Sequence, residues 1–161
     1  MSRPWSLMIE DVMTYLNSFE SYRAVGLKEF RFYDGRVLEV DEDGRFRADI
    51  LPALALDVDS LGHERAFEAQ FYTVVRVKMG IIYRASESNP TSADVENAID
   101  VVSGIINSRE GRISRLGSPR IKDYDFQPRM FRALNSYGTG LPRVWAWMSE
   151  LTLKGERRIL V

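Results

Sequence analysis

The central part of the chain alternates between apolar and polar residues, which predicts a long β-strand. Over residues 69–83, Val75, Val77 and Met79 fall on one side of an extended chain, and Arg76 and Lys78 fall on the other. Alternation of this kind, in a run rich in β-branched residues, is typical of a strand with one buried and one partly wet face. We therefore place this strand at the centre of a sheet.

A second apolar run, residues 50–59, predicts a neighbouring strand. It carries Pro52 near its start, a position that a strand tolerates. Residues 60–68 between the two runs are polar and include Gly62 and His63, so they predict an open loop that joins two antiparallel strands.

Two segments with apolar residues at helical spacing predict the helices that flank this hairpin. Residues 6–23 form one amphipathic pattern, with Ser6 as the expected N-cap and Gly26 as the expected stop. A second helix is expected to begin near residues 91–94, where Thr, Ser and Asp favour a helix start, and to end near Asn107.

The remaining segments give weaker patterns. Residues 28–49 hold two short alternating runs around an Asp34-Gly35 turn, which predicts short strands at a sheet edge or an arm. Residues 108–142 are basic and punctuated by Gly and Pro, so they predict a long loop. Residues 144–153 alternate again and predict a closing strand. The tail 154–161 ends in apolar residues, which offers a segment for pairing with a neighbour.

These elements predict one domain over residues 1–161, of the α/β (α+β) class. The expected architecture is a mostly antiparallel β-sheet flanked by two helices, with an extended arm and a long loop. A chain of 161 residues is long enough to bury a sizeable core. No apolar run approaches the ~18 residues of a membrane span, and the N-terminus lacks the apolar region of a signal peptide, so we expect a cytosolic site of synthesis and no membrane partner.

The composition excludes several kinds of chemistry. The chain has no cysteine, so it has neither disulfides nor thiolate metal ligands, and the single His63 excludes sites that need two histidines. Asp57, Asp59, Gly62 and Glu68 match four positions of a calcium-binding loop, but Leu61 stands where an oxygen ligand is needed.

A nuclease of the restriction-like type is also disfavoured, because the residue two places before Lys78 is Arg76 rather than an acid. No phosphate-binding glycine loop is present. We assign no catalytic residue, no cofactor and no metal site, and we expect a protein that is not an enzyme.

A cluster of basic residues between positions 109 and 132 is the best candidate for binding an acidic partner. These basic residues are Arg109, Arg112, Arg115, Arg120, Lys122, Arg129 and Arg132. Tyr124, Phe126 and Phe131 lie among them, a pattern found on nucleic-acid-binding surfaces. The competing interpretation is a loop that forms salt bridges with an acidic protein neighbour, and the net charge of −1 favours it.

The charge of the chain is unevenly distributed along its length. Residues 1–60 hold seven Lys or Arg against twelve Asp or Glu, whereas residues 109–161 hold eleven against five. Either the two segments mix in space and the asymmetry cancels, or an acidic edge of one copy meets a basic edge of the next copy.

The order and spacing of these elements resemble the tail terminator proteins of long-tailed bacteriophages and the related neck and minor tail proteins. An amphipathic helix is followed by an arm, a Pro-Ala-Leu-Ala-Leu strand (Pro52 to Leu56), a long strand with Thr-Val-Val-Arg-Val (Thr73 to Val77), a Pro-Thr-Ser helix start and a final strand. The resemblance covers residues 5–107 and the closing strand. The basic segment 108–142 is a departure from it.

The resemblance implies a structural virion protein that forms a hexameric ring, caps the tail tube and joins it to the head connector or stopper protein. It implies assembly in the host cytoplasm, residence in the tail or neck of the virion, and DNA only as passing cargo. Contacts between subunits or with partners are then expected at Phe30, Phe32 and Tyr33 of the arm and at the basic residues. The alternatives are another neck or minor tail component, or a nucleic-acid-binding module that uses residues 109–132.

Overall fold

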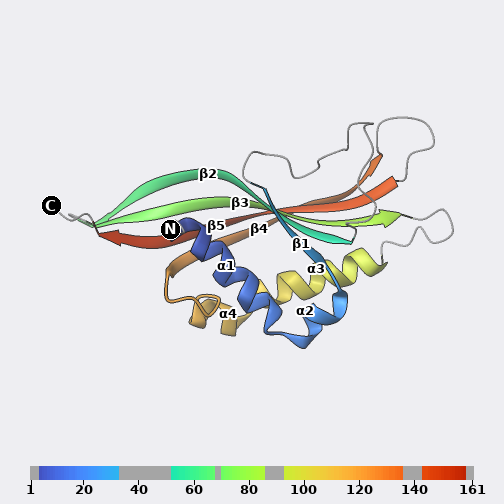
Figure 1. Cartoon of the computed structure of the whole chain (residues 1–161), viewed down its shortest axis with the longest axis horizontal. Helices are drawn as coiled ribbons and strands as arrows, with labels where there is room; N and C mark the ends of the chain where they lie inside the picture. The colour runs from blue at the N-terminus through green and yellow to red at the C-terminus, as the bar shows by residue number, and fades with distance from the viewer. Residues whose placement is uncertain (1–3, 33–51, 68–69, 86–92, 136–142, 159–161) are drawn as a thin grey trace.

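The computed structural model describes residues 4–32, 52–67, 70–85, 93–135 and 143–158. It is a mixed α+β fold, with a five-stranded sheet and four helices in these residues (Figure 1). In chain order the elements are α1 (Pro4–Asn17), α2 (Glu20–Val25), β1 (Lys28–Phe32), β2 (Ala53–Phe67), β3 (Gln70–Ala85), α3 (Ala93–Ile106), α4 (Arg109–Ser114), β4 (Ile121–Asn135) and β5 (Arg143–Arg158).

The sheet has the strand order β1-β2-β3-β5-β4 and is mostly antiparallel. Only β1 and β2 pair in parallel, whereas β2–β3, β3–β5 and β4–β5 are antiparallel. The central pair runs without a register shift from Gln70 opposite Arg158 to Ala85 opposite Arg143. Strands of 15 or 16 residues span about 50 Å at roughly 3.3 Å per residue.

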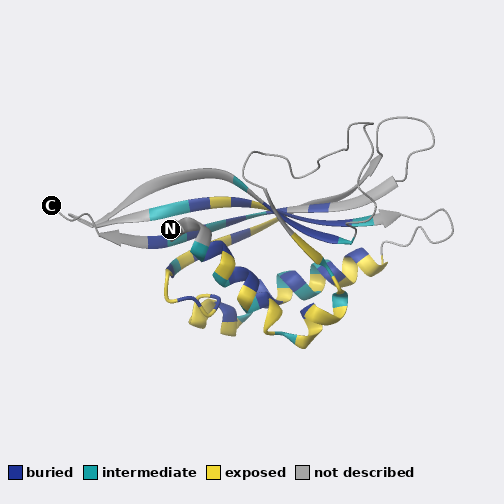
Figure 2. Cartoon of the chain, in the orientation of Figure 1, coloured by how far each residue is buried: buried dark blue, intermediate teal, exposed yellow. Residues whose placement is uncertain are grey.

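All four helices lie on one face of the sheet, and the core fills the space between the two layers (Figures 1 and 2). The core joins fully buried side chains of the helices, such as Leu16 and Ile106, to those of the strands, such as Met79, Ile81 and Leu153. Burial of this apolar area is the main force that holds the helix layer on the sheet.

The strand predictions for β3 and β5 are confirmed. In β3, Val75, Val77 and Met79 are buried and Arg76 and Lys78 are exposed, as the alternation indicated. Five residues are expected on one side of the closing strand, and four of them are buried in the same way: Trp147, Ser149, Leu151 and Leu153. The side chain of the fifth, Trp145, is outside the described residues. The helix expected to end near Asn107 is also confirmed, because α3 ends at Ile106.

The first helix differs from its prediction at the start. It begins at Pro4, so Ser6 lies inside α1 and is not its N-cap. Proline suits the first turn of a helix because its missing N–H would have no helical partner there. The expected stop at Gly26 is confirmed: Gly26 caps α2 with a φ of 75°, a left-handed conformation that glycine adopts easily.

The single helix predicted over residues 6–23 is wrong, because the chain breaks into α1 and α2. The Asn17 side chain donates to the Met13 carbonyl (2.8 Å), and the Ser18 hydroxyl donates to the Tyr15 carbonyl (2.6 Å). These bonds satisfy carbonyls at the end of α1, and Phe19 then adopts an extended conformation. The apolar spacing continues across the break, which explains why the pattern did not reveal it.

The open loop predicted for residues 60–68 is wrong for residues 60–67, since β2 continues to Phe67 and pairs with β3 as far as Gln70. A register shift between Val58 and Ser60 interrupts the period-two pattern, and polar residues can occupy a strand where it leaves the core. The calcium-loop positions 57, 59 and 62 consequently lie on an extended strand rather than in a binding loop.

The long loop predicted for residues 108–142 is also wrong, because it contains α4 and β4. Two register shifts, at Ile121/Asp123 and Pro128/Phe131, break the alternation of β4 and hide the strand in the sequence. Pro128 is tolerated because β4 is at the edge of the sheet, where a missing N–H disrupts no second ladder. Residues 136–142 lie outside the described residues.

Two further predictions concern the ends of the sheet. Residues 154–158 of the tail do not remain free for a neighbour, because they continue β5 and pair with β3 of the same chain. Residues 28–32 form the predicted edge strand, but β1 pairs in parallel with β2. The rest of the predicted arm, with the Asp34-Gly35 turn, and the tail residues 159–161 lie outside the described residues.

Candidate functional site

The predicted basic residues lie on α4, in the turn that follows it, and along the edge strand β4. Arg109 and Arg112 are on α4, Arg115 is its C-cap, Arg120 precedes β4, and Lys122, Arg129 and Arg132 are on β4. The side chains of Arg129 and Arg132 are outside the described residues. On the far edge of the sheet, Phe30 and Phe32 pair through their backbone with Ala55 and Asp57; their side chains, and all of Tyr33, are likewise outside.

The start of α4 is fixed tightly against the end of α3. The Ser108 hydroxyl accepts a hydrogen bond from the Gly111 N–H (2.9 Å) and donates to the Ile105 carbonyl (2.8 Å), so it caps one helix and closes the other. Gly111 is buried, and a Cβ on it would lie 2.8 Å from the Ile105 oxygen. The chain can therefore turn this sharply only with glycine at position 111.

The end of α4 contains three consecutive residues in the left-handed conformation. Arg115, Leu116 and Gly117 have φ values of 52°, 54° and 66°. Each non-glycine residue in this region costs roughly 1–2 kcal/mol. The Leu116 N–H bonds the Gly111 carbonyl (2.9 Å), and the Leu116 side chain is 1% exposed. Burial of Leu116 offsets the strain, whereas the preceding residue, Arg115, is exposed.

Arg112 ties α4 to β4 and is engaged within the chain. Its guanidinium lies 4.5 Å from the centre of the Tyr124 ring, donates to the Tyr124 carbonyl (2.9 Å) and also donates to the Asn107 side chain (3.2 Å). The Tyr124 hydroxyl in turn donates to the Ile106 carbonyl (2.6 Å). Burial raises the pKa of Tyr124 above its ordinary value, although the charge of Arg112 opposes this.

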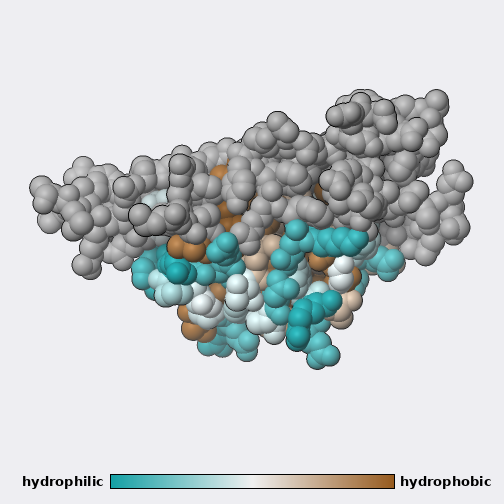
Figure 3. Space-filling view, viewed as in Figure 1, coloured by the Kyte–Doolittle hydropathy of each residue, from teal (hydrophilic) through white to brown (hydrophobic). Residues whose placement is uncertain are grey.

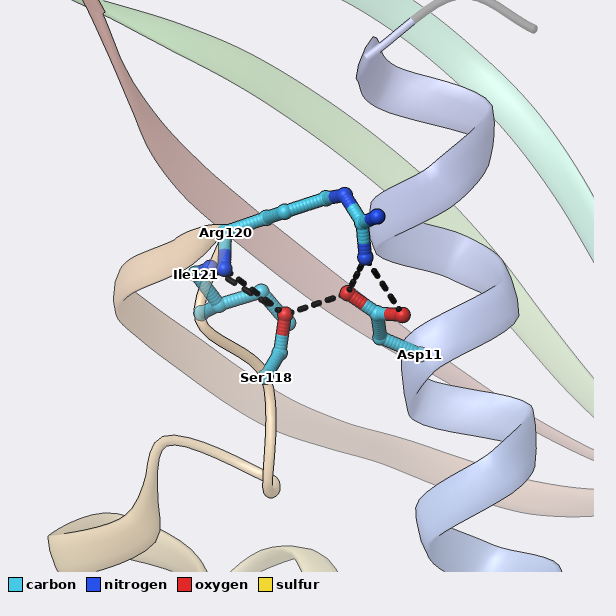
Figure 4. A network of polar contacts seen from close by, with 4 residues as sticks. All are labelled: Asp11, Ser118, Arg120 and Ile121. Atoms are coloured by element: carbon cyan, nitrogen blue, oxygen red, sulfur yellow. Dashed lines mark hydrogen bonds and ion pairs between the residues drawn. The ribbon is translucent and has the colours of Figure 1, made fainter.

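Arg120 belongs to a second internal network, which joins α1 to the start of β4 (Figure 4). One guanidinium nitrogen donates to both carboxylate oxygens of Asp11, at 3.0 and 2.9 Å. The Ser118 hydroxyl donates to the same carboxylate at 2.5 Å and accepts from the backbone N–H groups of Arg120 and Ile121. Of the basic residues with described side chains, Arg112 and Arg120 therefore serve the fold.

Arg109 and Arg115 are exposed and their side chains take no part in these networks, with Ile113 between them in sequence. Ile113 is 72% exposed and is the single large apolar residue of the described part of the chain with such exposure. Figure 3 shows apolar atoms at the surface over α4, beside hydrophilic atoms. We call Arg109, Ile113 and Arg115 the α4 knob. The charge pattern indicated its arginines, but nothing in the sequence distinguished Ile113 from a core residue.

The aromatic residues predicted beside the basic cluster do not form a stacking surface. Tyr124 is 4% and Phe126 is 5% exposed, and the Phe126 ring packs 6.0 Å from the ring of Trp147 in the core. A base cannot stack on a buried ring. The interpretation of Tyr124 and Phe126 as nucleic-acid contacts is therefore wrong, whereas the side chain of Phe131 is outside the described residues.

A second polar feature, which the sequence did not indicate, joins α1 and α2 to β1. One oxygen of the Glu29 carboxylate accepts hydrogen bonds from the Tyr22 hydroxyl (2.8 Å) and from the Asn17 side chain (2.7 Å). An open hollow of about 590 Å³ adjoins it, lined by Glu10, Met13, Thr14, Asn17, Ser18 and Glu29. Because Glu29 is on β1 and accepts from residues of α1 and α2, these two hydrogen bonds hold β1 beside the helices.

Replacement of Tyr22 by phenylalanine should make stability less dependent on alkaline pH. Burial and the adjacent Glu29 carboxylate raise the pKa of Tyr22 well above its ordinary value of 10.0. A raised folded-state pKa contributes stability that is complete below about pH 10 and is lost as the pH rises above it. Ionisation of Tyr22 on unfolding should therefore lower the free energy of unfolding by up to about 1.4 kcal/mol for each pH unit above about pH 10.

The measurement is urea unfolding of the wild type and of Tyr22→Phe at a series of pH values on both sides of about pH 10. Tyr83 and Tyr124, whose pKa values are also raised, are present in both proteins and cancel in the comparison. Equal slopes of stability against pH in the two proteins would contradict the prediction.

Within the residues that the structure describes, no group of three His, Asp or Glu side chains is placed to hold a metal ion. No helix in this part of the chain is long and apolar enough to cross a membrane. Comparison with known protein families and with curated proteins finds no match.

Proposed function

We propose that this chain is a structural virion protein, a tail terminator that forms a ring on the tail tube of a long-tailed bacteriophage and joins it to the head connector. The observation that supports this most is the ribbon that β2, β3 and β5 form beyond the helix layer. The end of β2, the start of β3 and the end of β5 lie past α1 at one end of the molecule (Figure 1). Such an extension lets one subunit reach its neighbour.

The internal use of polar residues also supports a structural role. Arg112 clamps α4 to β4, Arg120 and Ser118 tie α1 to β4, and Glu29 holds β1. Networks that connect neighbouring elements give a rigid subunit, and rigid subunits form closed rings with a defined number of copies. The exposed α4 knob is then available for contacts outside the subunit.

Both edge strands of the sheet have features that hinder pairing with strands of other molecules. β1 has five residues, and β4 carries Pro128, two register shifts and the exposed Asp123 and Asp125. Short strands, prolines, irregular register and charges discourage indiscriminate strand pairing. A ring subunit at micromolar concentration needs this protection because it must not aggregate before it meets the tube.

The test combines mass measurement with electron microscopy. The 18.5 kDa chain should form a closed oligomer, about six copies by the implied symmetry, alone or on tail tubes of the same phage. Images should show density at one end of each tube, and the tubes should stop growing when the protein is added. Monomers at every concentration, together with tubes that grow unchanged, would overturn the proposal. Density at another layer of the neck would assign the chain to the related neck or minor tail components.

A further inference from the structure

We infer that the α4 knob docks on the acidic surface that Asp94 and Asp100 provide on α3 in a second copy of this chain. The inference rests on the proposed function, because it names the contact through which copies would assemble. It is carried by three independent features of the described residues: the separation of charge along α3 and α4, the exposed apolar residue between two free arginines, and a strained residue that glycine would suit better.

Charge is separated along the α3–α4 unit. Asp94 and Asp100 are exposed on α3, and residues 93–108 contain no Lys or Arg. The arginines begin at Arg109, where α4 starts. α3 has 14 residues, so Asp94 near its start is separated from α4 by about 20 Å at 1.5 Å per residue, and Asp100 lies just past its midpoint. Figure 1 shows α3 running toward α4, with its start at the opposite end of the helix layer.

The knob has the composition of a contact site. Ile113 is 72% exposed, and an exposed apolar centre beside arginines is typical of residues that dominate binding. Among the described residues, no carboxylate forms an ion pair with Arg109 or Arg115, in contrast to the pair of Arg120 with Asp11. The capping by Ser108 and the clamp of Arg112 hold the knob rigid, which reduces the entropy lost on binding.

The backbone at Arg115 gives the third argument. Arg115 occupies the C-cap of α4 with a φ of 52°, where glycine is the preferred residue because it has no Cβ to clash. Arginine at this position costs about 1 kcal/mol of fold stability relative to glycine. The Arg115 side chain is exposed and forms no hydrogen bond, ion pair or ring contact within the described residues that offsets this cost. The presence of arginine rather than glycine at position 115 is explained if its charge binds an acidic group on another molecule.

The two surfaces lie on different parts of one copy, so the contact is heterologous. Each copy offers its knob to one neighbour and its acidic α3 surface to the other, and such contacts propagate until a ring closes. Opposite charges orient the approach, and like charges at the same place would oppose it. A second copy of this chain therefore supplies the acidic surface that the knob needs.

Charge reversal on either surface tests the inference. Arg109→Glu with Arg115→Glu should weaken self-association about a hundredfold, as should Asp94→Lys with Asp100→Lys, because each creates two repulsive pairs worth about 1.4 kcal/mol each. A mixture of the two variants should assemble again, since reversed knobs then face reversed α3 surfaces. Arg23→Glu with Arg76→Glu is the matched control: it changes the same charge at exposed residues of α2 and β3 and should leave association unchanged.

Two single variants separate binding from folding. Arg115→Gly should raise the free energy of unfolding by about 1 kcal/mol while weakening association about tenfold. Ile113→Ser should leave the free energy of unfolding unchanged, because position 113 is exposed, and should also weaken association about tenfold. Sedimentation gives the association constants, and urea unfolding gives the stabilities.

The outcomes distinguish this inference from the proposed function. A wild type that forms rings on tubes, with reversed variants that form them equally well, overturns the inference and leaves the proposed function standing. A wild type that never assembles overturns both. Loss of salt-sensitive DNA binding in the knob variants, without any loss of self-association, also overturns the inference and assigns the knob to nucleic acid.

Discussion

Replacement of Leu116 by alanine should lower the free energy of unfolding by about 3 kcal/mol, within the usual range of 2–5 kcal/mol for a buried leucine. Leu116 is 1% exposed and belongs to the core cluster, although it lies in the turn between α4 and β4. Its side chain is the apolar anchor that holds this turn in place, so its loss removes the buried contacts and leaves a cavity. Urea unfolding, followed by tryptophan fluorescence, measures the change.

Leu116→Gly is the control for this prediction, because helix and strand propensities alone would make the glycine variant less stable than the alanine variant. Leu116 has a φ of 54°, so alanine keeps the left-handed strain whereas glycine relieves about 1 kcal/mol of it. Leu116→Gly should therefore be more stable than Leu116→Ala, the reverse of their order inside a helix or strand. If alanine proves the more stable of the two, the strain at this turn does not contribute as we describe.

This turn shows which part of the fold the sequence did not predict. Strands β3 and β5 were predictable because one side faces the core over many residues, so buried and exposed positions alternate, as at Val77 and Lys78. α3 was predictable for the corresponding reason, since its apolar residues recur at helical spacing. Regular helices and strands with one buried face can therefore be predicted from a single sequence.

Irregular elements do not reveal themselves in this way. β4 keeps Tyr124 and Phe126 buried, but its two register shifts move the alternation out of phase, and Pro128 argues against a strand unless the strand is known to be at an edge. The break between α1 and α2 depends on side-chain bonds of Asn17 and Ser18 to carbonyls, which spacing does not record.

The candidate site was predictable in part. The sequence indicated a basic region. In the structure some of its arginines bind groups within the chain, and others are exposed. Arg112 and Arg120 find partners that lie 12 and 109 residues away along the chain, and such long-range pairing is determined by the tertiary structure. Ile113 was missed for the same reason: an isolated isoleucine gives no sign of whether its surroundings will cover it. The distinction between internal and external arginines therefore required the fold.

Replacement of Gly111 by alanine should lower the free energy of unfolding by about 2–3 kcal/mol, whereas Gly104→Ala should raise it by about 0.5–1 kcal/mol. A Cβ at Gly111 would lie 2.8 Å from the Ile105 carbonyl oxygen and 3.0 Å from the Ser108 hydroxyl. The first of these atoms belongs to the backbone and cannot move cheaply, and displacement of the second removes the cap of α4. The start of α4 would have to shift away from α3.

Gly104 is the matched control because it is an exposed glycine inside α3, with nothing within 4 Å of an added Cβ. Alanine there only restricts the unfolded chain and favours the helix. Urea unfolding of the two variants should therefore give stability changes of opposite sign, and changes of the same sign would contradict the prediction. Because Gly111 positions α4, its alanine variant should also displace the α4 knob, so its self-association should weaken while that of Gly104→Ala stays at the wild-type value.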